Sequence, residues 1–149
     1  MKLIIGGTCQ GKTAYLTEQL GISKEHVLCG EEIAKAVCDG AEKAELAENG
    51  VSYLENEQIK AINHLHLYIR ESLKKGLTQN EIQSEILSWL EKNPNLILVS
   101  DEIGYGIVPM DVFEREYREV AGRICCVLAQ KADMVIRVCC GLGNIIKGQ

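Results

Sequence analysis

The sequence predicts one α/β domain over residues 1–149, in which a mostly parallel sheet is flanked by helices. Its length of 149 residues fits a single domain with a substantial core. Apolar runs with strand character alternate with helical segments, as is typical of a parallel sheet. A glycine-rich turn joins the first predicted strand to the first predicted helix, and this turn indicates a P-loop nucleotide-binding fold.

The first part of the chain predicts two strands, each followed by a helix. Residues 2–5 form a short apolar run that predicts a buried strand, and 13–20 predict a helix. A second strand is expected at 26–30, before a helix over 31–48 that is rich in Ala, Glu and Lys. The run 51–54 is a weaker strand candidate.

The second part continues the alternation. Apolar residues at steps of three and four predict an amphipathic helix over 55–73. Thr78 and Glu81 have capping-box spacing and predict the start of a helix that ends at Asn93 before a proline. The last three elements expected are a buried strand over 95–100, a helix that begins after Asp111 and runs to about Lys131, and a strand over 134–140.

Composition narrows the classes of function. The net charge of -5 argues against a broad nucleic-acid surface, and no apolar run approaches the length of a membrane span. We therefore expect no nucleic-acid or membrane partner and a cytoplasmic location. The seven cysteines lack zinc-finger spacing, and we expect them to be small buried residues in a reducing compartment.

The stretch "GGTCQGKT" matches the pattern G-x-x-x-x-G-K-[ST] in the strand–turn–helix context that this pattern requires. The pattern predicts that the backbone N–H groups of this loop surround the phosphates. Lys12 would reach the outer phosphates, and Thr13 would bind Mg2+. The predicted nucleotide-binding residues are Gly6, Gly7, Thr8, Cys9, Gln10, Gly11, Lys12 and Thr13. The alternative is a glycine turn that matches by chance, but position and context both favour phosphate binding.

Asp101 and Glu102 end the apolar run 95–100, where α/β proteins bind their ligands. One carboxylate is expected to hold Mg2+ with Thr13, and the other to orient the acceptor or act as a base. Lys12, Asp101 and Glu102 are therefore the predicted catalytic residues. The alternative is an acidic helix cap or a solvated loop.

Four segments resemble the adenosylcobinamide kinase / adenosylcobinamide-phosphate guanylyltransferase family. They are "GGTCQGKT", "DEIGYGIVP", "YREVAGRICC" and "ADMVIRVCCGLGNIIKG", in the order and spacing of the family's motifs. The resemblance implies a RecA-like P-loop fold, often a homo-trimer, and GTP or ATP as a substrate with a corrinoid acceptor. It also implies two reactions: phosphorylation of the adenosylcobinamide hydroxyl, and transfer of GMP through a covalent histidine.

The family's histidine segment, "RIxxHxxxRP", has no match between Gly30 and Asn93, which argues against guanylyl transfer. A different family segment corresponds to "INHLHLYIRESL", and the family's acidic residue before it falls near Asn63. His64 and His66 are expected on different faces of a helix, either as residues without chemistry or as a guanylylated histidine.

Two hypotheses follow. The first is a kinase of the adenosylcobinamide type, and the second is a non-catalytic nucleotide-binding sensor or assembly subunit derived from that family. The phosphate loop and the retained carboxylates favour the kinase, whereas the short middle segment favours the second hypothesis.

Overall fold

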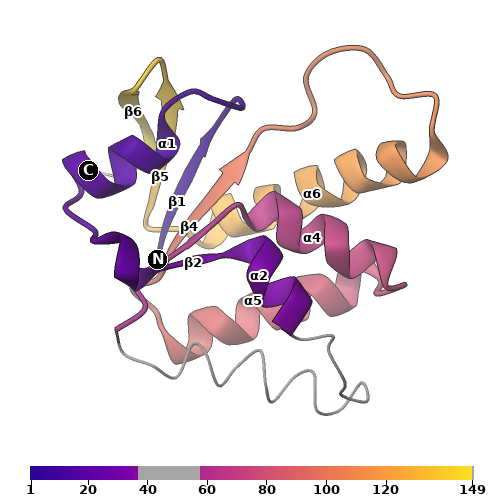
Figure 1. Cartoon of the computed structure of the whole chain (residues 1–149), viewed down its shortest axis with the longest axis horizontal. Helices are drawn as coiled ribbons and strands as arrows, with labels where there is room; N and C mark the ends of the chain where they lie inside the picture. The colour runs from indigo at the N-terminus through magenta and orange to yellow at the C-terminus, as the bar shows by residue number, and fades with distance from the viewer. Residues whose placement is uncertain (37–57, 149) are drawn as a thin grey trace.

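A six-stranded sheet in the order β2-β3-β4-β1-β5-β6 organises the protein (Figure 1). The structure is a computed structural model, and it describes residues 1–36 and 58–148. Its strands are β1 (Lys2–Gly6), β2 (Val27–Cys29), β3 (Ala61–Asn63), β4 (Ile97–Asp101), β5 (Met134–Cys139) and β6 (Leu142–Lys147). The first five pair in parallel, and β6 pairs with β5 in the antiparallel direction.

Helices cover both faces of this sheet. They are α1 (Lys12–Ala14), which continues as the π-helical turn η1 (Tyr15–Gln19), the 3-10 turn η2 (Lys24–His26), α2 (Gly30–Ala36), α4 (Leu65–Lys74), α5 (Gln79–Lys92) and α6 (Val112–Lys131). The α/β P-loop fold class predicted from the sequence is confirmed. The extent of the domain, 1–149, stays a prediction.

The alternation of side chains along β1 separates two apolar clusters. Leu3 packs into the larger cluster with Trp89 of α5, together with residues of α4 and α6. Ile4 packs into the smaller cluster with Leu16 of η1 and Val99 of β4. Strands that are buried on both faces read as continuous apolar runs, which is why the strands at 2–5 and 95–100 could be recognised from the sequence.

The parallel arrangement determines where the site lies. Strand β1 lies between β4 and β5, and Gly6 at its end is level with Asp101 at the end of β4. Strand β3 lies on the other side of β4 and ends at Asn63. The carboxyl ends of three neighbouring strands therefore meet at one edge, beside the loop that leads into α1 (Figure 1).

The predicted helix over 55–73 is wrong between residues 58 and 64, and its residues 55–57 lie outside the described part of the chain. Ala61–Asn63 form the buried strand β3 between β2 and β4, and α4 begins only at Leu65. His64 between them has a left-handed backbone with φ 55, which prevents the helix from extending backwards. Spacings that resemble one helical stripe are thus divided between a strand and a helix.

Two further features differ from expectation. Strand β6 was not predicted, because its six residues are all exposed and show no alternation of burial. The helix predicted over 13–20 is α-helical only at its start and becomes π-helical at Tyr15. Helix α2 confirms the beginning of the helix expected over 31–48, whereas the rest of that helix and the strand candidate at 51–54 lie outside the described residues.

The expectation of buried cysteines is wrong at four positions. Cys9, Cys126, Cys139 and Cys140 are exposed, because they lie in the glycine loop, on the outer side of α6 and at the turn between β5 and β6. Cys29 and Cys125 are partly buried, and Cys38 lies outside the described residues. Among the helices described, none is both long and apolar enough to cross a membrane.

Candidate functional site

The glycine loop between β1 and α1 is shaped by contacts that exclude side chains. A Cβ atom on Gly6 would lie 2.3 Å from the carbonyl oxygen of Val138. Gly11 has φ 84, in the left-handed region that favours glycine. Within the loop, the Gln10 backbone N–H donates to the Gly7 carbonyl at 3.3 Å. The loop therefore turns tightly and leads into the amino terminus of α1, the arrangement expected of a phosphate cradle.

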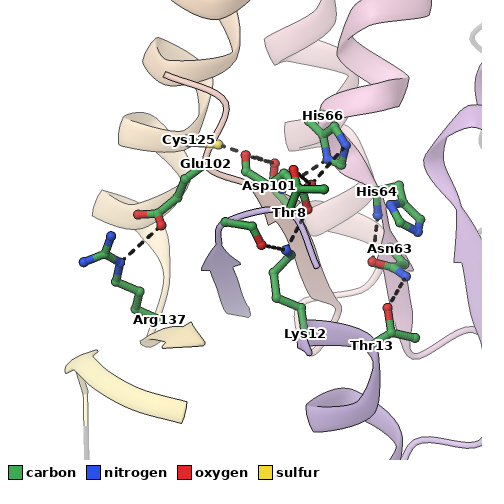
Figure 2. Close-up of polar contacts among 12 residues, drawn as sticks. Thr8, Lys12, Thr13, Asn63, His64, His66, Asp101, Glu102, Cys125 and Arg137 are labelled. Carbon is green, nitrogen blue, oxygen red and sulfur yellow. Dashed lines mark hydrogen bonds and ion pairs between the residues drawn. The ribbon is translucent and has the colours of Figure 1, made fainter. Parts of the chain in front are cut away.

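Lys12 is buried beneath this loop and turned back toward it. Its Nζ donates to the Gly7 carbonyl oxygen at 2.7 Å and lies 2.7 Å from Oδ1 of Asp101 (Figure 2). The two side chains are only 7% and 10% exposed. A fixed cation thus lies between the loop backbone and the end of β4, where it could contact a phosphate oxygen.

Asp101 also accepts a hydrogen bond from the glycine loop. Thr8 donates its hydroxyl proton to Oδ2 of Asp101 at 2.8 Å. Burial acts to raise the pKa of Asp101, but the hydrogen bonds from Lys12 and Thr8 and the charge of Lys12 hold this pKa below its ordinary value. Asp101 is therefore a carboxylate at neutral pH.

His66 of α4 contacts both the backbone and the side chain of Asp101. Its Nδ1 accepts from the Asp101 backbone N–H at 3.1 Å, and its Nε2 lies 3.8 Å from Oδ2 of Asp101. Burial lowers the pKa of His66, although the Asp101 charge opposes this effect. A neutral ring that accepts at Nδ1 carries its proton on Nε2, so that this proton faces the carboxylate. His66 therefore orients Asp101.

The end of β3 holds the other important residue of the loop, Thr13. The Nδ2 of Asn63 donates to Oγ1 of Thr13 at 3.1 Å, and Oδ1 of Asn63 accepts from the His64 backbone N–H at 2.9 Å (Figure 2). The second bond fixes the orientation of the amide. A neutral amide N–H, rather than a carboxylate, therefore faces the hydroxyl that was predicted to bind Mg2+.

Glu102 is separated from Asp101 although the two are adjacent in the chain. Its carboxylate accepts from Nε of Arg137 at 3.2 Å, on the side away from Lys12 (Figure 2). Arg137 also donates to the Tyr105 hydroxyl at 3.3 Å. The hydrogen bond and the charge of Glu102 raise the pKa of Arg137. The structure thus divides the predicted pair into one carboxylate at the lysine and one at an arginine.

The two histidines are close together, contrary to the expectation that they point to different faces of a helix. Their ring centroids are 5.7 Å apart, because His64 precedes α4 and only His66 lies within it. Sequence reasoning also missed Arg137, which interrupts the apolar run of β5. An arginine at an outward-facing position of an otherwise apolar strand is the signal that could have indicated it.

The site can be tested for a fit to Mg2+. Among residues 1–36 and 58–148, no three His, Cys, Asp or Glu side chains gather to hold a metal ion. Such a cage is not required, because Mg2+ in nucleotide sites is held by one or two protein oxygens together with substrate phosphates and water. The hydroxyl of Thr13 and the carboxylate of Asp101 are hard oxygen donors of this kind.

Comparison with known proteins identifies the family. The family described as cobinamide kinase / cobinamide phosphate guanyltransferase matches residues 40–146, a range that includes Asn63, His66, Asp101 and Arg137. The bifunctional adenosylcobalamin biosynthesis protein CobU of Escherichia coli (strain K12) is 40% identical over 67 residues, which are 45% of this chain and 37% of that protein. The protein of the same name from Salmonella typhimurium is 40% identical over 68 residues, which are 46% of this chain and 38% of that protein.

The aligned segments thus span less than two fifths of these relatives, whereas the family match covers most of this chain. The family's description refers to a kinase of cobinamide and a guanyltransferase of cobinamide phosphate. On this evidence the chain belongs to the cobinamide kinase / cobinamide phosphate guanyltransferase family.

Proposed function

We propose that this protein is a nucleotide-dependent kinase that transfers the γ-phosphoryl group of GTP or ATP to the hydroxyl of adenosylcobinamide. The observation that carries the proposal is the contact of Lys12 with both the Gly7 carbonyl and the Asp101 carboxylate. This contact puts a fixed cation beside a loop whose N–H groups can bind phosphates. Phosphoryl transfer requires mainly positioning and electrostatic stabilisation, which such groups supply.

The loop residues have separate roles in binding the phosphates and the metal ion. The backbone from Gly7 to Thr13 binds the β- and γ-phosphates, and Lys12 stabilises the charge on the γ-phosphoryl group as it moves. The Thr13 hydroxyl and the Asp101 carboxylate are the groups that would hold Mg2+. When bound, Mg2+ neutralises negative charge on the phosphate oxygens.

The two carboxylates have different roles in this proposal. Asp101, oriented by His66 and ionised at neutral pH, would hold Mg2+ beside the transferred phosphate. Glu102, held by Arg137, lies farther out and would orient the acceptor. Glu102 is therefore retained as a catalytic candidate, but it is a weaker candidate than Asp101 for the metal.

The segment that follows Glu102 offers a surface for a large apolar acceptor. Its exposed apolar side chains are Tyr105, Ile107, Val108, Met110 and Val112. Tyr105 connects this segment to Arg137, which donates to its hydroxyl. This surface supports the proposal of a corrinoid substrate. A homo-oligomer, a trimer by resemblance, also remains part of the proposal.

Guanylyl transfer receives less support. His66 uses Nδ1 to accept from the Asp101 backbone and directs Nε2 at the Asp101 side chain, so neither nitrogen is available as a nucleophile. His64 is only partly buried and is the better candidate of the two for a covalent GMP. We include this activity only as a property to be tested.

A specific observation favours the second function, that of a non-catalytic nucleotide-binding sensor or assembly subunit. Asn63 presents an amide to Thr13 where a carboxylate would favour Mg2+. A protein that binds nucleotide without turnover does not need a strongly held metal ion. Cytoplasmic location would suit either function.

Incubation with adenosylcobinamide and GTP or ATP labelled at the γ-phosphate tests the proposal. The kinase predicts labelled cobinamide phosphate from the wild type and none from Lys12→Met, which keeps most of the length of the side chain but removes its charge. Tight nucleotide binding without transfer would support the sensor instead. Acid-labile GMP on the protein, lost in His64→Ala but kept in His66→Ala, would establish the guanylyl transfer.

A further inference from the structure

The chain contains two pairs of adjacent cysteines, but only one pair presents both thiols together. The Sγ atoms of Cys139 and Cys140 are 4.0 Å apart, and both residues are exposed. In the other pair, Cys125 packs inward with its Sγ 3.9 Å from the Ser100 hydroxyl, whereas Cys126 is exposed. Successive residues of a helix point about 100° apart, which separates the thiols of this second pair.

Backbone geometry explains why the first pair converges. Successive side chains of a strand point to opposite faces, and Cys139 is the last residue of β5. Cys140 leaves the strand with φ 50, and Gly141 follows with φ 80. These two left-handed residues form the turn into β6 and end the alternation, so that the two thiols lie near one another. The hydrogen bond with the Cys139 thiol and the charge of Cys139 raise the pKa of Cys140.

The turn that carries these thiols also holds the phosphate loop. The Cys140 backbone N–H donates to Oε1 of Gln10 at 2.7 Å, and the Gly141 backbone N–H donates to the Gln10 carbonyl at 2.9 Å. A Cβ atom on Gly11 would approach the Gly141 Cα to 3.0 Å. A change in the turn therefore acts directly on two residues of the loop.

We propose that Cys139 and Cys140 form a dithiol modification site for a thiophilic centre that bonds two sulfurs, such as trivalent arsenic, and that its occupation weakens nucleotide binding. The second half of this proposal rests on the proposed function, because it requires that the loop bind a triphosphate. The first half stands on the two thiols alone.

Geometry favours a bridging centre over a disulfide. Neighbouring Cα atoms are about 3.8 Å apart, below the range of about 4.4–6.8 Å that an unstrained disulfide requires. A centre that bonds both sulfurs joins them without a direct sulfur–sulfur bond, so the two thiols, whose Sγ atoms lie 4.0 Å apart, need little movement to bind it. Zinc favours four protein ligands, and in the part of the chain that the structure describes no third ligand joins the pair. A monosubstituted trivalent arsenical requires only these two sulfurs.

The reaction of the two thiols with an arsenical needs no oxidant. An organic arsenoxide exchanges its arsenic–oxygen bonding for two arsenic–sulfur bonds. Both thiol protons leave with the oxygen as water, and arsenic stays trivalent. A small dithiol added in excess reverses the exchange.

Phenylarsine oxide and intact-protein mass spectrometry test the site. We expect one arsenical per wild-type chain, none on Cys139→Ser or Cys140→Ser, and one on Cys126→Ser, the matched variant from the other pair. Capture that survives in Cys139→Ser or Cys140→Ser would overturn the proposal. Loss of capture in Cys9→Ser would also overturn it, because Cys9 would then be one of the two sulfurs.

Titration with a fluorescent GTP or ATP analogue tests the coupling on the same samples. If the arsenical disturbs one or two of the hydrogen bonds to Gln10, the Kd of the nucleotide should rise about five- to tenfold on the loaded wild type. The small dithiol should reverse this rise. An unchanged Kd on fully loaded protein would overturn the coupling. If the unloaded protein binds no nucleotide, the proposed function fails, whereas the stoichiometry of capture still decides the dithiol site.

Discussion

The pair formed by Lys12 and Asp101 gives a prediction whose magnitude follows from its geometry. Two unit charges 2.7 Å apart attract by roughly 6 kcal/mol at an effective dielectric constant of about 20, before desolvation is counted. Both side chains are at most 10% exposed, so that removal of one partner leaves a charge with little access to water. Breaking such a pair typically costs about 3–5 kcal/mol. Because Thr8 still donates to Asp101, we expect Lys12→Met to lower the free energy of unfolding by about 3 kcal/mol.

A double-mutant cycle separates the pair from the two single substitutions. Asp101→Asn should also destabilise the protein, because the Lys12 charge then loses the carboxylate that balances it. The double variant carries neither charge, and we expect it to be more stable than the sum of the single effects predicts, by about 2 kcal/mol.

Urea unfolding at neutral pH can follow this cycle through the fluorescence of Trp89, the single tryptophan of the chain and a fully buried one. Effects of the two substitutions that add within about 0.5 kcal/mol would refute the reasoning, because they would mean that the two groups do not interact.

Three other predictions follow from the same structure. Gly6→Ala brings a Cβ to 2.3 Å from the Val138 carbonyl oxygen and should destabilise the protein by about 2–3 kcal/mol in urea unfolding. The control Gly104→Ala, with no atom within 4 Å of its new Cβ, should not destabilise it. Equal effects of the two substitutions would contradict the loop geometry. Asn63→Asp should strengthen the dependence of nucleotide affinity on Mg2+ in calorimetry, because it adds a carboxylate beside Thr13, and an unchanged dependence would contradict this role. Burial lowers the pKa of His66 in the folded state, so the unfolded state binds the proton more readily. The free energy of unfolding of the wild type should therefore fall as the pH drops below about 6.5, the pKa of an unfolded histidine, and His66→Asn should remove that part of the loss. An identical pH dependence in the two proteins would show that the histidine is not the cause.

Features that depend on neighbours in sequence could be predicted. The phosphate loop, the cap at Thr78 and the cap at Asp111 are local signals, and the structure has the Thr78 capping box and the bond from the Glu114 N–H to Asp111. Strand β4 was also predictable, because both of its faces are buried and its first three residues, Ile97 to Val99, are apolar.

Features that depend on distant parts of the chain could not be predicted. Ala61–Asn63 form a strand because β2 and β4 lie on either side of them, and three residues carry too little periodicity to show this. The hairpin of β6 depends on a left-handed Cys140, which sequence rules do not anticipate at a non-glycine residue.

The division of the carboxylates has a similar origin. Asp101 was predicted at the site from its position after a strand, and its partner Lys12 came from the loop pattern. The partner of Glu102, Arg137, comes from β5, which is 35 residues away in the chain. Two adjacent acidic residues at the end of a strand do not reveal which cation each will meet.

Calorimetric titration of the folded protein with GTP and with ATP, in the presence of Mg2+, tests the central claim most directly. We expect heat of binding with at least one of the two nucleotides, at about one site per chain, and an affinity that is at least tenfold weaker in Lys12→Met. Absence of binding by either nucleotide, or an affinity that the loss of the Lys12 charge leaves unchanged, would contradict the assignment of this loop as a phosphate site.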